Sequence, residues 1–233
     1  SSKHPNNAAL IFKEGQVIVD GVRIHNAHDG IRPWHRSSDG AGLSGFSVWN
    51  SWFSYIRDDC IENDSGIGGV IEDNLFDGCY VFLSARGAEA QGTQDAKLIT
   101  ISQNLIHLQK MPGPFGHDLE NLDGHGELFK FDAGSPRIAL HNNIFLIEGF
   151  PITRYGADSW RKNAPTTLSF QPERLASCAG NIIVWLGEGP FPGKIPADPG
   201  CVTVTTDISV WETARAAWLV AHPSVARVPG VDP

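Results

Sequence analysis

The chain is poor in methionine, in charged residues and in long apolar runs. Methionine occurs once in 233 residues and only 19% of the residues are charged, so the helical runs rich in Leu, Ala, Glu and Lys that build bundles are scarce. No stretch of about 18 apolar residues is present, which excludes a membrane-spanning helix. The net charge of −8 disfavours nucleic acid as a partner, because binding to a phosphate backbone requires clustered Lys and Arg.

Cysteine is also scarce, and no secretion signal is visible. Four cysteines are too few for a disulfide scaffold in a chain of this size, although a bridge between Cys178 and Cys201 in the loop-rich C-terminal part is an open alternative. The opening residues SSKHPNNAAL lack the charged and apolar regions of a signal peptide. The chain is therefore either cytosolic or exported without its signal, and of the two we expect a secreted or periplasmic protein.

Glycine, proline and short alternating segments are abundant. The chain has 25 Gly and 15 Pro, and turn pairs such as Asp20-Gly21 and Asp77-Gly78 punctuate it. Between the turns, apolar and polar residues alternate over a few positions, as in Ile99-Thr100-Ile101. This period of two predicts strands of about three to five residues.

Four of these segments resemble one another. They read IEDNLFDG (71–78), ISQNLIHL (101–108), LHNNIFLI (140–147) and CAGNIIVW (178–185). Each places an asparagine ahead of two apolar residues, at Asn74, Asn104, Asn143 and Asn181. The spacing between these asparagines varies while the short apolar core does not, which is typical of stacked strands joined by loops of variable length.

These repeats predict an all-β fold, a right-handed parallel β-helix solenoid over residues 1–190. Strands this short bury their faces only when the strands of successive coils stack. The repeated asparagine should lie at a bend between sheets and bind the asparagine of the next coil. An antiparallel β-sandwich is the competing fold, but the two-residue hairpin loops that it needs, such as Asn-Gly, are absent.

Residues 191–233 are predicted to form a Pro/Gly-rich loop and a short capping helix of the same domain. From Asp207 onward the sequence is amphipathic, with Asp207 or Ser209 as the N-cap. Its apolar face is expected to hold Val210, Ala214, Ala217 and Trp218. The helix should cover the open end of the solenoid, with a partner-binding helix as the alternative. The chain could also be the C-terminal half of a longer solenoid.

The stretch RDDCIEND at 57–64 is the strongest candidate for chemistry, because it surrounds an apolar pair with ionisable groups. Aligning the turns makes Asp29-Gly30-Ile31, Asp59-Cys60-Ile61 and Asp77-Gly78-Cys79 equivalent, with the last residue of each pointing inward. One outer row of the solenoid should then carry the side chains that follow, and its turn edge should carry acids and histidines. The row is Arg32, Glu62, Tyr80 and Lys130, and the edge is His28, Asp29, Asp58, Asp59 and His125.

The motif order AHDGI (27–31), RDDCI (57–61), DGHG (123–126) and PRIA (136–139) resembles the pectin-lyase-like superfamily of β-helices. It is weakly similar to the polygalacturonase-type glycoside hydrolases within it. The resemblance implies that Asp29, Asp58, Asp59 and His125 are catalytic, with aspartates protonating the leaving oxygen and activating water. It also implies that Arg137 binds substrate. Position 28 is His where the family motif has Thr, and position 139 is Ala where it has Lys.

Together these features predict a carbohydrate-active enzyme acting on an acidic polysaccharide, either a hydrolase or a lyase or epimerase of uronate sugars. Arg32, Lys130 or Arg137 could neutralise a uronate carboxylate, and His28 and His35, which flank Arg32, could bind it. The predicted substrate-binding set is His28, Arg32, Glu62, Tyr80, Lys130 and Arg137.

No cofactor is required for this chemistry, but a calcium site is an open alternative. Ca²⁺ prefers six or more oxygen ligands, and the cluster that could supply them is Asp58, Asp59, Glu62 and Asp64. The other functional alternative is a non-catalytic β-helix of the glycan-binding or tailspike type. In that case Trp34, Trp49, Trp52 and Tyr55 would stack on sugars or form an interface.

Overall fold

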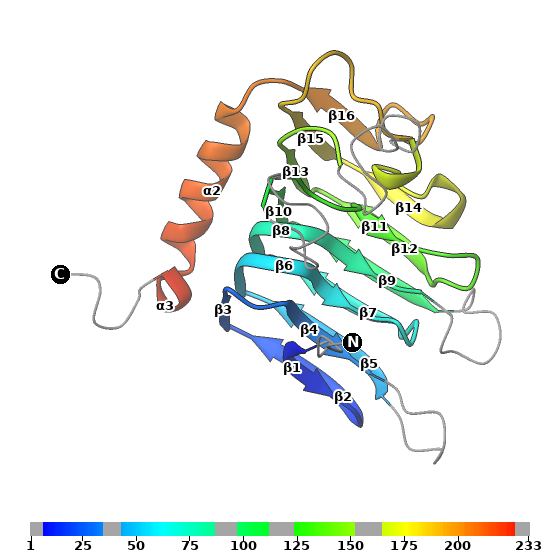
Figure 1. The fold of residues 1–233 in the computed structure, drawn as a ribbon, viewed down its shortest axis with the longest axis vertical. Helices are drawn as coiled ribbons and strands as arrows, with labels where there is room; N and C mark the ends of the chain where they lie inside the picture. The colour runs from blue at the N-terminus through cyan, green and yellow to red at the C-terminus, as the bar shows by residue number, and fades with distance from the viewer. Residues whose placement is uncertain (1–6, 35–42, 87–96, 112–123, 152–164, 227–233) are drawn as a thin grey trace, which may run out of the picture.

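The described part of the chain is built from parallel β-strands in two sheets, with one longer helix beside them (Figure 1). The computed structural model describes residues 7–34, 43–86, 97–111, 124–151 and 165–226. Every pairing between the named strands is parallel. The antiparallel sandwich is therefore wrong, and the arrangement is compatible with a parallel β-helix.

The larger sheet, called the first sheet, contains ten of the described strands. Its strands are β1 (Ala8–Phe12), β3 (Arg23–His25), β4 (Asp29–Pro33), β6 (Trp52–Glu62), β8 (Leu75–Ser84), β10 (Leu105–Leu108), β11 (Phe129–Lys130), β13 (Ile144–Ile147), β15 (Asn181–Trp185) and β16 (Val202–Thr205).

The smaller or second sheet contains six described strands. They are β2 (Gly15–Asp20), β5 (Leu43–Trp49), β7 (Gly69–Glu72), β9 (Leu98–Ser102), β12 (Arg137–His141) and β14 (Leu175–Ala179). From β5 to β10 the chain alternates between the two sheets, and each strand pairs with one from the neighbouring passage of the chain. Residues far apart in the sequence are thereby stacked.

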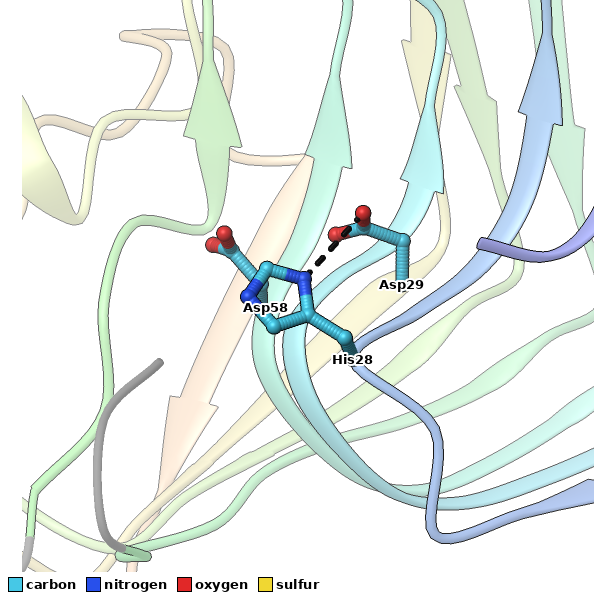
Figure 2. A group of neighbouring side chains, drawn as sticks. All are labelled: His28, Asp29 and Asp58. Carbon is cyan, nitrogen blue, oxygen red and sulfur yellow. Dashed lines mark hydrogen bonds and ion pairs between the residues drawn. The ribbon is translucent and has the colours of Figure 1, made fainter. Parts of the chain in front are cut away.

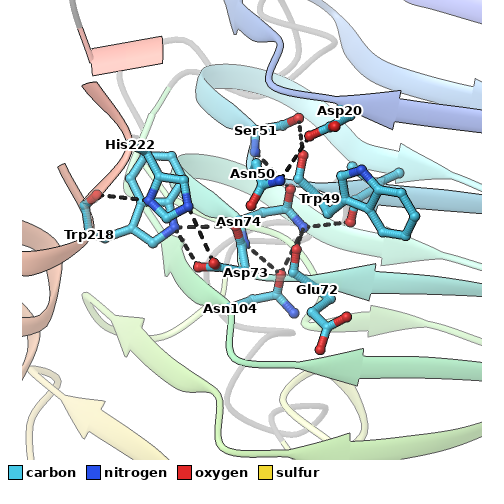
Figure 3. Close-up of polar contacts among 11 residues, drawn as sticks. Asp20, Trp49, Asn50, Ser51, Glu72, Asp73, Asn74, Asn104, Trp218 and His222 are labelled. Carbon is cyan, nitrogen blue, oxygen red and sulfur yellow. Dashed lines mark hydrogen bonds and ion pairs between the residues drawn. The ribbon is translucent and has the colours of Figure 1, made fainter. Parts of the chain in front are cut away.

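A ladder of buried asparagines holds the bend between the two sheets, as predicted (Figure 3). The Asn104 side-chain oxygen accepts hydrogen bonds from the Asn74 backbone N–H at 3.0 Å and from the Asn74 side-chain amide at 2.9 Å. Asn104 and Asn143 donate in the same way to Asn143 and Asn181 respectively. Ser51 extends the ladder, because its backbone N–H donates to the Asn74 side chain.

The residue just before each ladder position turns the chain into the first sheet. These residues have φ angles from 51° to 68°, the left-handed region that Gly, Asn and Asp tolerate best. They are Asn50, Asp73, Gln103, Asn142 and Gly180. Each asparagine amide then donates to backbone carbonyls at the bend, for example from Asn104 to Ile71 at 2.8 Å. Side chains thus satisfy carbonyls that the bend removes from the strand ladders.

The core lies between the sheets and continues from Val17 to Val202. A stack of aromatic rings fills its middle, with centroids of Phe53 and Phe76 4.8 Å apart and those of Phe76 and Phe82 5.1 Å apart. The core reaches β16, which pairs with β15. Residues 191–233, for which a loop and a capping helix of the same domain were predicted, therefore also contain a strand of the first sheet.

Two disulfides cross-link the stack. Cys178–Cys201 confirms the bridge left open from the sequence, with its Cα atoms 4.8 Å apart. Cys60–Cys79 was not predicted and joins the buried parts of β6 and β8, with Cα atoms 5.8 Å apart. No cysteine of the chain is free.

The C-terminal helix α2 (Ser209–Ala221) lies along the side of the stack (Figure 1). Its Trp211 and Trp218 pack on an outward apolar row that includes Leu75 and Leu105. Arg215 forms an ion pair with Asp77, so charge as well as burial holds the helix. The short helix α3 (Pro223–Ala226) follows.

The prediction for this helix was correct in its position along the chain and wrong in its details. The N-cap position is Ile208, between the two residues predicted for it, and the Asp207 carboxylate accepts the Ser209 N–H at 3.0 Å from one residue further back. Trp211 occupies the packed face where Ala217 was expected, and Ala217 is exposed. The helix covers the apolar row of Leu75 and Leu105 on the outside of the first sheet and does not close an open end of the stack (Figure 1). No described helix is long and apolar enough to cross a bilayer.

Replacing Asn104 by Ala should destabilise the fold by about 2–4 kcal/mol, because it leaves buried backbone groups of two coils without partners. Urea denaturation measures the loss. The matched control is Asn142→Gly at an exposed position with φ 57°, which should change the free energy of unfolding by less than about 1 kcal/mol. Equal losses in the two variants would contradict a stabilising role for the ladder.

Candidate functional site

The candidate site lies where β4, β6, β8 and β11 stack in the first sheet. Ile31 pairs with Ile61, Ile61 with Leu83, and Leu83 with Phe129, and all four side chains are buried. The residues that follow them form one outer row: Arg32, Glu62, Ser84 and Lys130. Three of the four residues predicted for this row are therefore in place, and Ser84 occupies the position expected for Tyr80.

The error comes from a register shift between β6 and β8. Ile56 pairs with Cys79, but Asp59 pairs with Val81, so β6 holds one extra residue between the two pairs. The predicted equivalence of Asp29 and Asp59 is correct, because the Asp59 backbone N–H donates to the Asp29 carboxylate at 3.2 Å. The predicted equivalence with Asp77 is wrong, since Asp77 pairs with Ser54 beneath helix α2.

Asp59 and Lys130 form a largely buried ion pair at the centre of the site. The Lys130 Nζ lies 3.0 Å from Asp59 Oδ2, and Asp59 is 1% exposed. The other carboxylate oxygen of Asp59 has no hydrogen-bond partner among the described residues. Burial, together with the neighbouring Asp58 carboxylate, raises the pKa of Asp59 well above its ordinary value, and Lys130 opposes this rise. The pair is thus a buried acid only partly compensated by its cation.

Of the two adjacent acids Asp58 and Asp59, Asp58 is the one that reaches the surface. It is half-buried, and burial raises its pKa to about 6, with Lys130 opposing and Asp29 adding to the rise. A carboxyl group with such a pKa exchanges a proton near neutral pH, as general acids and bases must. Asp59 can influence this proton electrostatically but is too buried to contact a substrate.

His28 and Asp29 form a second proton-transfer unit beside Asp58 (Figure 2). The His28 Nδ1 lies 3.3 Å from Asp29 Oδ2, and this hydrogen bond raises the pKa of His28. One ligand atom from each of His28, Asp29 and Asp58 lies within 4.8 Å of the others. His28 is half-buried while Asp29 is fully buried, so Asp29 orients the imidazole and His28 and Asp58 face the surface.

The same three side chains are the described group most nearly arranged for a metal ion. Ca²⁺ takes six to eight oxygens, whereas this group supplies two carboxylates and a nitrogen. Both Asp29 oxygens already accept hydrogen bonds. The group alone therefore fits calcium poorly.

The calcium cluster predicted from the sequence is not assembled as four free ligands. Asp59 pairs with Lys130, Glu62 lies 3.4 Å from the Arg32 guanidinium, and the Asp64 carboxylate accepts the Ser84 hydroxyl proton at 2.6 Å. Three of the four acids thus have protein partners. Glu62 and Arg32 also neutralise each other in the outer row.

Tyr80 lies near the site, and Gly126 makes room for its ring. The Asp58 and Glu127 carboxylates, together with burial as the largest cause, raise the pKa of Tyr80 to about 12. A Cβ atom at position 126 would lie 2.8 Å from the Tyr80 ring. The absence of a side chain at Gly126 therefore leaves space that the Tyr80 ring occupies.

His125 is buried away from solvent and bound to the backbone. Its Nε2 lies 2.6 Å from the Gly149 carbonyl oxygen and its Nδ1 lies 3.0 Å from that of Gly126. Burial lowers the pKa of His125, and a neutral imidazole donates through only one nitrogen, which we assign to the shorter contact. This placement gives His125 a structural role, in contrast to the catalytic role predicted for it.

Arg137 is also separated from the site. It lies exposed on β12 of the second sheet and donates to the Leu175 carbonyl at 3.1 Å. It therefore cannot join the substrate-binding set on the first sheet. His35 lies outside the described residues.

A cleft of about 340 Å³ adjoins the site. It is lined by Arg86, Glu127, Phe129, Phe131, Pro165, Thr166, Thr167, Ser169, Gln171, Glu173 and Lys194. The cleft was not predicted, because its walls come from four separate segments with no shared motif. Arg57 was not predicted either; it is exposed and close enough to His28 to lower the pKa of that imidazole.

Comparison of the chain with protein family models, with curated proteins and with solved structures found no match. The geometry of the site therefore carries the functional argument.

Lys130→Met should destabilise the protein by about 2–3 kcal/mol, because Asp59 would lose its cation. The pKa of Asp59 is already raised on folding, so its contribution opposes folding increasingly as pH rises above the ordinary value of 3.8. Without Lys130 the pKa rises further, and the loss should be larger at about pH 8 than at about pH 5 in urea denaturation.

The matched control is the double variant Asp59→Asn with Lys130→Met, which has no ionisable group at position 59. Its loss of stability should depend less on pH than that of Lys130→Met over the same range, with the remaining dependence coming from Asp58, whose pKa Lys130 also lowers. A pH-independent loss in Lys130→Met alone would contradict the buried ion pair.

Proposed function

We propose that the chain is an enzyme acting on an acidic polysaccharide, and that its reaction begins with removal of the proton next to a uronate carboxylate. The observation that carries this proposal is the pair of half-buried groups His28 and Asp58, whose ligand atoms lie within 4.8 Å of each other. Burial raises the pKa of Asp58 to about 6, and the hydrogen bond to Asp29 raises the pKa of His28 above its ordinary value of 6.5, so the Asp58 carboxylate and the His28 imidazolium can be present together.

In the proposed reaction Asp58, as carboxylate, accepts the proton from C5 of the uronate ring. The electron pair of that C–H bond forms a C4–C5 double bond as the C4–O4 bond breaks. His28, as imidazolium, donates its proton to O4 of the departing sugar. Asp29 holds the imidazole in place through its 3.3 Å hydrogen bond. An epimerase would share the first step and return a proton to C5 from the opposite face.

Removal of this proton requires a positive charge on the sugar carboxylate. Arg57 is exposed beside His28, and its guanidinium makes no hydrogen bond or close ion pair within the described residues. A guanidinium binds a carboxylate through two parallel hydrogen bonds. We assign this role to Arg57, because Arg32 and Lys130 already have acidic partners.

The geometry favours elimination over inverting hydrolysis. An inverting glycosidase keeps its two carboxyl groups roughly 6.5–9.5 Å apart to admit a water molecule. Carboxylate oxygens of Asp29 and Asp58 lie within 4.8 Å of each other, and Asp29 is fully buried. This pair therefore leaves no room for the attacking water.

The fold and the cysteines support the same proposal. Parallel sheets linked by an asparagine ladder agree with a right-handed parallel β-helix of the pectin-lyase-like type, whose outer face would present a long groove to a polymer. Two disulfides agree with an oxidising compartment, so we propose that the protein is secreted or periplasmic. The proposed fold, compartment and substrate class are consistent with one another.

The alternative of non-catalytic glycan binding through exposed aromatic rings has less support. Arg23 lies over the Trp52 ring at 4.0 Å from its centroid, and Lys13 and Arg32 lie over Trp34 at 5.2 and 5.3 Å. Cations of the protein thus occupy ring faces on which a sugar would stack.

Incubation with a panel of polyuronates should yield unsaturated oligosaccharides, detected by ultraviolet absorbance and mass spectrometry. Asp58→Asn and His28→Gln should each reduce kcat by at least about 100-fold, because each removes one proton-transfer group. The matched control His141→Gln lies on the second sheet, where the imidazole bonds to Ser177, and should retain activity. Saturated products, or full activity in both variants, would reject the proposed reaction.

The pH profile of kcat/KM should be bell-shaped. Activity should rise with pH through about 6 as Asp58 ionises, and fall above the ordinary value of 6.5 as His28 loses its proton. Asp29→Asn replaces the charged acceptor that raises the His28 pKa by a neutral one, and should move the alkaline limb to lower pH. A profile that is flat from about pH 5 to about pH 8 would contradict these assignments.

A further inference from the structure

The cleft beside the site has a lining that indicates which part of a substrate it binds. The cleft lies next to the acids of the site, because Lys130, between the cleft residues Phe129 and Phe131, reaches the carboxylate of Asp59 at 3.0 Å. Glu127 lines the cleft, and its carboxylate, like that of Asp58, contributes to the raised pKa of Tyr80. Lys130 follows the cleft residue Phe129 in the same strand, and its charge lowers the pKa of both Glu127 and Asp58.

The walls of the cleft combine an apolar floor with polar groups. Phe129 is buried and Phe131 is half-buried, with their ring centroids 5.4 Å apart. Gln171 is held by a hydrogen bond from its amide to the Phe129 carbonyl at 3.4 Å, so its side-chain oxygen is directed by the protein. A partly exposed aromatic ring beside fixed polar groups is suited to a sugar, which has an apolar ring face and hydroxyl edges.

The two cations of the cleft differ in whether they already have an acidic partner. Lys194 forms an ion pair with Glu173 at 3.1 Å. Arg86 is exposed and makes no hydrogen bond or close ion pair within the described residues. It lies close enough to Glu127 to lower the pKa of that carboxyl group. Arg86 is therefore the cation of the cleft that is available to an incoming anion.

We propose that this cleft binds a sugar next to the reacting one and that Arg86 recognises the carboxylate of that sugar. The proposal rests on the proposed function, because it takes the substrate to be a polymer of uronates. A planar guanidinium matches a carboxylate with two parallel hydrogen bonds, and Gln171 and Phe131 would contact the hydroxyls and the ring. Arg86 is thus a specificity-determining residue.

The balance of charge in the cleft narrows the class of ligand. Two cations, Arg86 and Lys194, face two acids, Glu127 and Glu173. Such a lining accommodates one carboxylate per sugar and disfavours densely sulfated or phosphorylated chains, which would meet the two acids. A neutral glycan would leave Arg86 without a partner, and would bind more weakly for that reason.

Binding can be measured separately from turnover in the Asp58→Asn background. Isothermal titration calorimetry with the full chain would compare a polyuronate oligosaccharide, the same oligosaccharide after reduction of its carboxyls to alcohols, and a heparin oligosaccharide as the sulfated probe. Adding Arg86→Gln should weaken binding of the polyuronate about 10-fold and leave binding of the reduced oligosaccharide unchanged. Arg86→Lys should be intermediate, because an ammonium offers no planar fork.

Arg137→Gln is the matched control, since Arg137 is exposed on the second sheet and should not contribute. A circular dichroism spectrum of Arg86→Gln equal to that of the parent would exclude misfolding. Equal affinity of Arg86→Gln and the parent for the polyuronate, binding of heparin in preference to polyuronate, or no binding at all would overturn the inference. If polyuronate binding depends on Arg86 but the native chain never cleaves or epimerises it, the proposed reaction fails while the binding site stands.

Discussion

The structure depends on side-chain hydrogen bonds that join one coil to the next at the bend between the sheets. Asn74, Asn104, Asn143 and Asn181 each occupy the same position, and each of the first three donates to the next. These bonds fix which residues of successive coils lie opposite each other, because a slip of one residue would place the asparagine in the wrong face of the strand. The register of the strands beyond the bend follows from this constraint.

Register converts separate stretches of sequence into one site. Asp29 and Asp59 are 30 residues apart, yet the backbone N–H of one donates to the carboxylate of the other. Lys130 reaches Asp59 across 71 residues. Stacking also buries the acids, and burial is the largest cause of the raised pKa values of Asp58 and Asp59. The same packing that stabilises the fold therefore prepares the acids for proton transfer.

Part of this arrangement could be predicted from the sequence. The asparagine repeats, the parallel strands and the row formed by Arg32, Glu62 and Lys130 follow from short-range patterns that stacking preserves. The register of β8 could not be predicted, because a single extra residue in β6 moves Tyr80 out of the row and brings Ser84 in. No local signal in the sequence distinguishes such an insertion from an ordinary turn.

Other features depend on contacts that no single segment encodes. The Cys60–Cys79 bridge requires the two strands to be in their final register before the thiols meet. Helix α2 lies along the stack because the outer row from Leu75 to Val184 is apolar and needs covering, a property visible only once the coils are aligned. The burial of His125 could not be predicted, because a Gly-His-Gly motif gives no indication of whether its histidine faces solvent or two buried carbonyl groups.

The most direct test of the account is the pKa of Asp58, measured by carbon-13 NMR titration of its side-chain carboxyl in the folded protein. Stacking of the coils around this acid predicts a titration midpoint of about 6. A midpoint near the ordinary value of 3.8 would show that the carboxylate is fully hydrated, and would contradict both the buried cluster and the chemistry assigned to it.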